Sequence, residues 1–421
     1  ATKMPRTLPS AVIVLGHTLA SWCWGRGSQA LSQSHGEHDN RATRLSSIHF
    51  FFLLMSAEPN RVLRFSGHAY LRQRLVLATL AGRPVRIDKI RPDDEEPGLR
   101  DFEASFLRLL EKITNGSAVE INYTGTSIYF QPGIIYGGSI VHDCPLSRGI
   151  GYFLEWIVPL APFAKQEVSL TLRGITSGQG DVGADTIRTV TLPHLTLFMP
   201  LDSVSMLASA LEMRIVKRGA APLGGGEIFF RAPLIATLRP LEFVEPGRIR
   251  KIRGIASSVR VSPQMSNRMI DAARSVLNRY IPDLYLFSDV YRGDESGKSP
   301  GFAMSLVATS TTGALHAAEA TSSPGQTPED VGLLAARALL SCIETGGCID
   351  PMHQPLVLTL MAVGPGDVAR CRMGALTPQA VQSLRDIRDA LGVTFKIRAM
   401  EDGSVMLTCV GVGFRGFRQV R

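Results

Sequence analysis

The chain has 421 residues, of which 45% are hydrophobic and 19% are charged. This composition excludes a mainly disordered, collagen-like or coiled-coil protein, and the length suffices for about two or three domains. The chain carries 45 Lys and Arg against 37 Asp and Glu, and the resulting formal net charge of +8 makes a polyanion such as nucleic acid a candidate partner.

Residues 1–54 differ in character from the rest of the chain. Their apolar patches, at residues 11–15 and 50–54, are far shorter than the roughly 20 residues that a membrane-spanning helix requires. Met55 opens a segment typical of a natural start, so we expect residues 1–54 to be a disordered or non-native extension and not a domain. We also expect no membrane partner.

From residue 62 onward, short β-rich runs alternate with amphipathic helical stretches, which is typical of an α/β or α+β domain. The recurring unit is two helices on a small sheet, and it appears about three times. We expect strands at 85–90, 118–123, 127–130, 167–172 and 227–231, and helices at 99–113, 149–163, 187–198 and 203–212. We assign residues 55–247 and 302–421 to this repeat domain.

The pattern changes between residues 248 and 301. A strand at 251–261 precedes a helix that Ser262 caps and Pro263 opens, and a second strand at 284–290 completes a βαβ unit. We therefore expect residues 248–301 to form an inserted α/β subdomain. Further elements of the repeat domain are expected at 302–309, 327–345 and 377–391.

The chain lacks the common motifs of cofactor sites. Its six cysteines are scattered, without the paired spacing of a zinc knuckle or the density of a disulfide framework. The run G-D-E-S-G-K-S at 293–299 has three residues between its glycines where a P-loop has four, and a strand follows it. We interpret this run as a solvated turn and expect neither a metal nor a cofactor.

The most specific motif runs from Arg218 to Ile228, with the sequence R-G-A-A-P-L-G-G-G-E-I. Consecutive glycines let backbone N–H groups approach an anion or another chain closely, and they also suit a plain tight turn. The segment resembles the signature of the RNA 3′-terminal phosphate cyclase family. The residues that match this signature are Arg218, Gly219, Pro222, Gly224, Gly225 and Gly226.

The resemblance covers residues 62–414. The family's I-R followed by P-G-L-R is matched at 90–91 and 97–100, and its F-x-P-G at 130–133. The resemblance implies the family fold, in which a large domain of three repeated two-helix, four-strand units carries a small inserted α/β domain.

One departure from the family pattern concerns the nucleophile. Active cyclases carry a His that ATP adenylylates, in a stretch that resembles E-H-L-A-D-Q, and the matching stretch here is I-D-P-M-H-Q at 349–354. This places Asp350 at the nucleophile position, where a carboxylate does not reproduce the stable phosphoramidate of imidazole. We therefore expect no catalytic residue, and we interpret His353 as a structural or RNA-contacting residue.

Further segments, at 172–176, 185–193, 251–256 and 297–302, resemble the branch of the family that serves eukaryotic ribosome biogenesis. This implies a nuclear, nucleolar protein of the small-subunit processome that lacks cyclase activity and acts in 18S pre-rRNA processing. The implied partners are a ribosome-assembly GTPase, pre-ribosomal RNA and processome proteins.

Arginines at or beside the family motifs are candidates for binding RNA phosphate, because the guanidinium group is a rigid two-pronged donor. A surface salt bridge is the other interpretation of each. These candidates are Arg72, Arg91, Arg100 and Arg173.

Two alternative functions remain open. The first is an endonuclease that cleaves pre-rRNA, with Arg385, Asp386 and Lys396 as its candidate residues, although the same spacing suits an exposed helix face. Mg²⁺ binding there requires that two of Asp350, Asp386 and Asp389 converge. The second is an ATP-dependent RNA 3′-phosphate cyclase in which His353 replaces the nucleophile.

Overall fold

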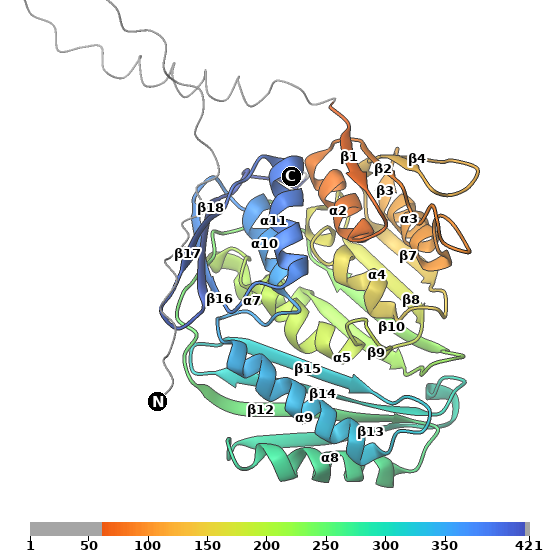
Figure 1. Cartoon of the computed structure of the whole chain (residues 1–421), viewed down its shortest axis with the longest axis vertical. Helices are drawn as coiled ribbons and strands as arrows, with labels where there is room; N and C mark the ends of the chain where they lie inside the picture. Colours follow the sequence, from red (N-terminus) through yellow and green to blue (C-terminus); the bar gives the residue numbers. More distant parts are fainter. Residues whose placement is uncertain (1–60, 417–421) are drawn as a thin grey trace, which may run out of the picture. The chain divides into compact units, whose positions relative to one another are not determined.

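The structure, a computed structural model, describes residues 61–416 (Figure 1). The extension expected at residues 1–54 lies outside the described residues. Within residues 61–416, every helix is too short or too polar to span a membrane.

The first two repeats follow one another along the chain. The first contains β1 (Leu63–Ser66), α2 (Leu71–Ala81), β2 (Val85–Asp88), α3 (Asp101–Ile113), β4 (Ala118–Ile121) and β5 (Ile128–Gln131). The second contains β7 (Gly138–Asp143), α4 (Ile150–Ile157), β8 (Val168–Gly174), α5 (Ala184–Thr186), the π-helical turn η2 (Ile187–Thr191), α6 (Leu192–Thr196), α7 (Val204–Ala210), β9 (Glu212–Lys217) and β10 (Gly226–Ala232). A small ribbon pairs β3 (Thr114–Asn115), which follows α3 within the first repeat, with β6 (Ile134–Ile135), which precedes β7.

The third repeat is interrupted by an insertion. The repeat contains β11 (Glu242–Phe243), α10 (Gln354–Val363), β16 (Val368–Met373), α11 (Pro378–Leu391), β17 (Lys396–Ala399) and β18 (Val405–Val410). Between β11 and α10 the chain forms β12 (Ile249–Val259), α8 (Pro263–Leu277), β13 (Leu284–Tyr291), β14 (Gly301–Ser310), β15 (Leu315–Thr321) and α9 (Pro328–Thr345).

The three repeats share one sheet topology. Within residues 61–416 their strand orders are β1-β2-β5-β4, β7-β8-β10-β9 and β11-β16-β18-β17. The first pair of each sheet is parallel and the other two pairs are antiparallel. The structure therefore confirms the predicted α/β class with repeated two-helix, four-strand units and an inserted α/β element.

The fourth sheet, in the order β13-β12-β14-β15, belongs to the insertion. One core cluster joins this sheet to α8 and α9, and it contains Ile252 of β12, Met269 of α8 and Leu339 of α9. On its other face Val307 and Ala317 contact Val190 of η2.

The sheet of the insertion continues past residue 301, where the expected subdomain ends. β14 pairs with β12 along its whole length, and β15 and α9 complete the layer. We propose residues 249–345 as the extent of the inserted unit.

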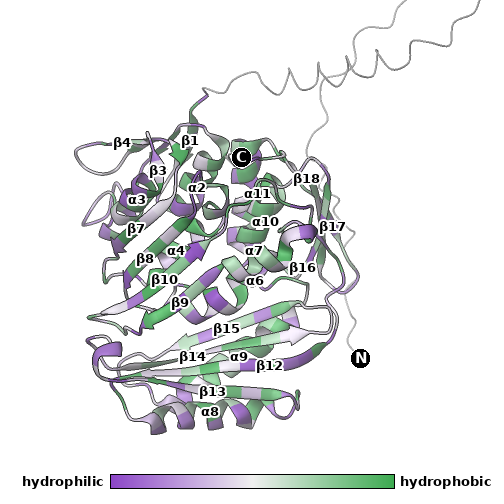
Figure 2. Ribbon diagram, turned by 180° about the vertical axis from the view of Figure 1, so that it is seen from behind, coloured by the Kyte–Doolittle hydropathy of each residue, from purple (hydrophilic) through white to green (hydrophobic). Residues whose placement is uncertain are grey.

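Two helices of the repeats are buried on almost every side. All residues of α10 are buried, as are nine of the eleven in α2, so neither helix has the exposed polar face of an amphipathic helix. In Figure 2, α10 is mostly hydrophobic. A stripe of apolar residues marks a helix that is half exposed. These central helices pack between the sheets and carry or adjoin the residues of the candidate site.

Candidate functional site

The glycine signature joins β9 to β10 and packs against the loop at 293–299. A Cβ atom on Gly219 would lie 2.2 Å from the backbone nitrogen of Gly226, and one on Gly297 would lie 2.2 Å from the carbonyl oxygen of Gly224. The Lys298 backbone N–H donates to that same oxygen at 2.8 Å. The glycines thus allow backbones to touch, and the loop expected as a solvated turn is instead held against them.

Arg218, which opens the signature, is a buried link between the second repeat and the insertion. Its guanidinium group donates to Asp185 of α5 at 2.7 and 2.9 Å and to Asp289 of β13 at 2.7 and 3.0 Å. Burial opposes its charge, but the two carboxylates outweigh burial and raise the pKa of Arg218 above its usual value. The signature arginine therefore holds two parts of the fold together.

The four candidate arginines for phosphate binding each have a different carboxylate partner. The shortest nitrogen–oxygen distances are 3.1 Å for Arg72 and Glu155, 2.7 Å for Arg91 and Glu103, 2.6 Å for Arg100 and Glu96, and 2.8 Å for Arg173 and Glu227. The side chain of Arg173 is exposed, whereas that of Arg91 is largely buried. The structure does not gather these residues into one anion-binding group.

Arg72 lines a cavity of about 380 Å³ where the three repeats and the inserted sheet meet. The side chain also lies over the Tyr152 ring, with 3.9 Å between its guanidinium carbon and the ring centroid. The ionisable residues that line this cavity are Arg72, Glu155, Asp181 and Glu319. Arg72 is paired with Glu155, and Arg148 from outside the lining is paired with Asp181, so Glu319 gives the cavity a small excess of carboxyl groups, which disfavours a polyphosphate.

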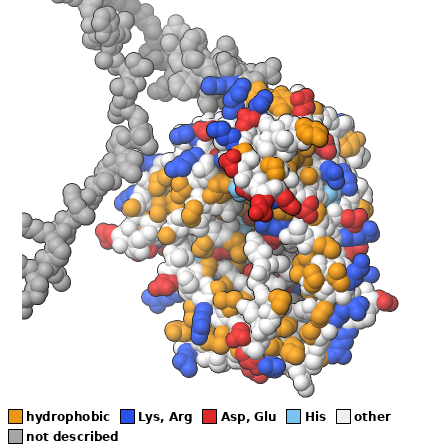
Figure 3. All heavy atoms as spheres, turned by 45° about the vertical axis from the view of Figure 1, so that its right-hand side comes forward, with side chains coloured by type: hydrophobic (Ala, Val, Ile, Leu, Met, Phe, Trp, Pro, Cys, Tyr) orange, Lys and Arg blue, Asp and Glu red, His pale blue; other side chains and the backbone are white. Residues whose placement is uncertain are grey.

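The charged side chains on one face of the described chain are mixed in sign. In Figure 3, Lys and Arg side chains are spread among Asp and Glu side chains and hydrophobic ones. This face therefore shows charges of both signs, although the formal charge of the whole chain is positive.

Asp350 and His353 lie in the turn that leads into α10 and contact residues of the second repeat. The Nδ1 atom of His353 lies 2.7 and 2.8 Å from the two carboxylate oxygens of Asp350. Its Nε2 atom lies 2.7 Å from the hydroxyl of Thr191, the last residue of η2. Asp350 is 0% exposed and His353 is 2% exposed. Both nitrogens of this imidazole therefore have partners in the interior.

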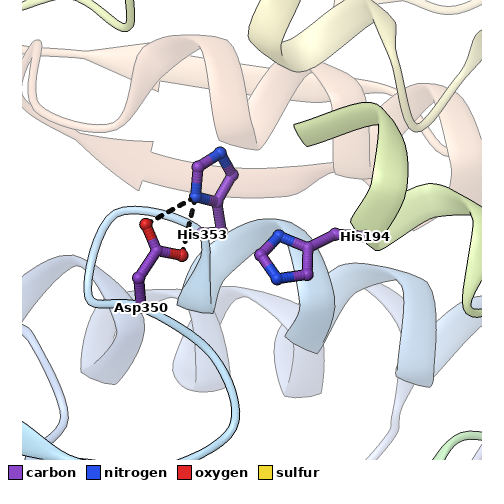
Figure 4. A group of neighbouring side chains, drawn as sticks. All are labelled: His194, Asp350 and His353. Carbon is purple, nitrogen blue, oxygen red and sulfur yellow. Dashed lines mark hydrogen bonds and ion pairs between the residues drawn. The ribbon is translucent and has the colours of Figure 1, made fainter. Parts of the chain in front are cut away.

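His194 of α6 lies beside this pair (Figure 4). Its ring centroid is 5.0 Å from that of His353, and neither of its nitrogens has a hydrogen-bond partner among the described residues. Burial lowers the pKa of His194 to about 3, so its ring is neutral. Burial disfavours the charged forms of Asp350 and His353 as well. The attraction and hydrogen bond between the two side chains outweigh burial, so the pKa of Asp350 is lowered and the pKa of His353 is raised.

The candidate nuclease residues are not assembled into one site. Asp386 of α11 is buried and accepts hydrogen bonds from Gln73 and Arg74 of α2. Arg385, its neighbour in α11, is exposed, and so is Lys396 at the start of β17. Among residues 61–416, the group with metal-ligand spacing is His194, Asp350 and His353, and it includes neither Asp386 nor Asp389.

Comparisons with known proteins point to one family. The family model described as RNA 3′-terminal phosphate cyclase matches residues 63–397. The RNA 3′-terminal phosphate cyclase-like proteins of Bos taurus and Homo sapiens are each 50% identical over 364 residues, which cover 84% of this chain and 96% of the relative. An rRNA processing protein of Schizosaccharomyces pombe is 49% identical over 354 residues, which cover 83% of this chain and 96% of the relative.

Proposed function

Since the chain belongs to the RNA 3′-terminal phosphate cyclase family, we propose that it acts in small-subunit pre-rRNA processing as a binding protein without cyclase activity. Support for the role in rRNA processing comes from the relative of that name, whose match covers 83% of this chain. The observation that carries the loss of cyclase activity is the buried Asp350 at the nucleophile position.

Asp350 is unsuited to the covalent step of a cyclase. That step needs a nucleophile that reaches the α-phosphate of ATP, and the Asp350 carboxylate is 0% exposed and bonded to His353. A carboxylate also gives a labile acyl phosphate where imidazole gives a phosphoramidate. His353 is a poor replacement, because Asp350 and Thr191 engage both of its ring nitrogens.

The neighbouring cavity argues in the same direction. Glu155, Asp181 and Glu319 line it together with a single arginine, Arg72. Arg72 and Arg148 already pair with Glu155 and Asp181, so no arginine of the lining is free to bind a triphosphate, and the carboxyl of Glu319 disfavours one. The cavity lining and the replacement of the nucleophile thus both support the proposal that the chain lacks cyclase activity.

The inserted sheet offers a surface for single-stranded RNA. Tyr285 and Phe287 of β13 are 56% and 51% exposed, and their ring centroids are 4.5 Å apart. Arg253 of β12 is paired with Tyr285 in the parallel register, and its partly exposed guanidinium group forms an ion pair with Asp283 at 2.9 Å. Bases of unpaired RNA stack on exposed aromatic rings. We assign the RNA contact to this aromatic face of β13.

The further partners are proposals that rest on the family resemblance. They are a ribosome-assembly GTPase and proteins of the small-subunit processome, and their location is the nucleolus within the nucleus. A pull-down of the full chain from nuclear extract, with the bound RNA sequenced and the bound proteins identified, tests them. We expect precursor rRNA together with a GTPase. Recovery of assorted RNA 3′ ends without processome proteins would contradict the proposal.

The absence of cyclase chemistry has a direct test. The full chain is incubated with ATP labelled in the α-phosphate, and acid-labile, base-stable label on the protein is measured, with an active family cyclase as the positive control. We expect no label on the wild type. Label that His353→Ala abolishes would show that His353 serves as the nucleophile and would overturn this part of the proposal.

A further inference from the structure

Three buried side chains from two different repeats converge on one point (Figure 4). His194 comes from α6 of the second repeat, and Asp350 and His353 come from the turn before α10 of the third. One potential ligand atom of each lies within 4.8 Å of the other two. Each residue is at most 2% exposed. Two imidazoles and a carboxylate are a donor set that divalent transition metals prefer.

His194 gives an independent indication of a ligand. It is 1% exposed, and neither Nδ1 nor Nε2 has a hydrogen-bond partner among residues 61–416. A buried polar group without a partner is unfavourable and is rare in folded proteins. A neutral imidazole carries a free lone pair on one of its two ring nitrogens. A bound cation would satisfy that nitrogen.

The surroundings of His353 are those of a metal-binding histidine. Its Nδ1 atom faces Asp350, and its Nε2 atom lies 2.7 Å from the Thr191 hydroxyl. Histidines that bind metal through one nitrogen usually donate the other N–H to an oxygen, which fixes the ring orientation. Thr191 ends the π-helical turn η2, a type of irregularity that is frequent at functional sites.

Carboxyl groups line the cavity next to His194, Asp350 and His353. Met352, which lies between Asp350 and His353 in the sequence, lines the cavity of about 380 Å³. The carboxyl groups of Glu155 and Glu319 line the same cavity and interact electrostatically with His353. A negative potential at this point attracts a cation and repels an anion.

We propose that His194, Asp350 and His353 bind a divalent transition-metal ion, with Zn²⁺ as the first candidate and water as the fourth ligand. Binding replaces the direct contact between His353 and Asp350 and releases the proton on Nδ1 of His353. The ion then joins the second repeat to the third at the position of the family's nucleophile. The proposal depends on the geometry of three side chains and not on the role in rRNA processing.

The test measures metal binding to the full chain. Zinc content is determined by mass spectrometry, and Co²⁺ is added as a probe because histidine-bound tetrahedral cobalt absorbs visible light. We expect about one Zn²⁺ per chain and a cobalt spectrum in the wild type. His194→Gln should lower the affinity for Zn²⁺ at least about 100-fold, and Thr191→Val should lower it about 10–100-fold, as loss of an outer-shell partner does.

The matched control is His142→Gln. His142 is also buried, it has one nitrogen without a partner among the described residues, and it hydrogen-bonds to Ser105 at 2.9 Å, apart from the metal group. This variant should bind Zn²⁺ as the wild type does. If His194→Gln does not fold, as judged by circular dichroism, Thr191→Val decides the question, since it keeps the side-chain volume. A wild-type chain that binds neither Zn²⁺ nor Co²⁺, or an equal loss in His142→Gln, overturns the proposal.

Discussion

Arg218 and Asp185 form a buried two-pronged ion pair, with nitrogen–oxygen distances of 2.7 and 2.9 Å. Asp289 completes the arrangement from the inserted sheet. Removing one partner of a buried ion pair leaves an uncompensated charge, which costs about 3–5 kcal/mol. We therefore expect Arg218→Ala to lower the free energy of unfolding by this amount, as measured by urea denaturation. The control is Arg173→Ala, whose exposed ion pair should matter little, and equal effects of the two variants would refute this account.

The close approach of Gly219 to Gly226 gives a second prediction about stability. A Cβ atom on Gly219 would lie 2.2 Å from a backbone nitrogen, whereas one on Gly366 would meet nothing within 4 Å. Gly219→Ala should therefore cost about 1–3 kcal/mol or more, because backbone segments must separate. Gly366→Ala should leave the unfolding free energy unchanged or slightly higher. Equal stability of the two variants would show that the signature glycines serve another purpose.

Sequence reasoning located helices that begin with clear capping signals and have one exposed face. Ser262 caps α8, Thr327 caps α9, and Thr377 caps α11, each followed by a proline in the first turn. It did not locate α2 or α10 from periodicity, because burial on nearly all sides removes the polar face. The full extent of the inserted sheet was also missed, since the pairing of β12 with β14 leaves no local mark in the sequence.

The candidate site was predicted only in part for a related reason. The family resemblance pointed to Asp350 and His353, which are neighbours in sequence. Their contact with the second repeat joins Thr191 and His353, which are 162 residues apart, and it arises from the packing of repeats. The expectation of no metal centre followed from cysteine spacing, and His194 carries no spacing signal because its proposed co-ligands are far along the chain. Likewise, the partners of the candidate arginines became visible only in the folded chain.

The buried His142 of β7 gives a prediction for the pH dependence of stability. Burial lowers the pKa of His142 to about 4, whereas an unfolded histidine has a pKa near 6.5. Between these values the unfolded chain binds a proton that the folded chain does not. The contribution of His142 to stability is therefore full above pH 6.5 and is lost as the pH falls toward 4.

We expect His142→Gln to flatten the pH dependence of the unfolding free energy in this window, by the equivalent of about one proton. Urea denaturation of both proteins at a series of pH values measures the two slopes. Equal slopes of the unfolding free energy against pH in the variant and the wild type would contradict the lowered pKa of His142.

The aromatic face of β13 gives a prediction for RNA binding. Tyr285 and Phe287 are exposed, so the double variant Tyr285→Ser, Phe287→Ser should fold normally. Stacking of a base on an aromatic ring contributes about 1–3 kcal/mol, so we expect affinity for single-stranded pre-rRNA to fall about tenfold or more. Fluorescence anisotropy at one fixed salt concentration measures this change. Tyr123→Ser, which removes an exposed ring between β4 and β5, is the control, and an equal loss there would rule out a specific surface.

Restoring the nucleophile separates the two obstacles to cyclase chemistry. Asp350→His places an imidazole at the position of the family's nucleophile but leaves Glu155, Asp181 and Glu319 in the adjoining cavity. If the acidic cavity excludes the triphosphate, the variant should remain without label from ATP under conditions in which an active family cyclase is labelled. Adding Glu155→Gln and Glu319→Gln to Asp350→His reduces the negative charge of the cavity. We expect this triple variant to bind ATP more tightly than Asp350→His does, even before any label appears on the protein. Label on Asp350→His alone would show that the nucleotide site is intact and that the loss of activity rests on residue 350.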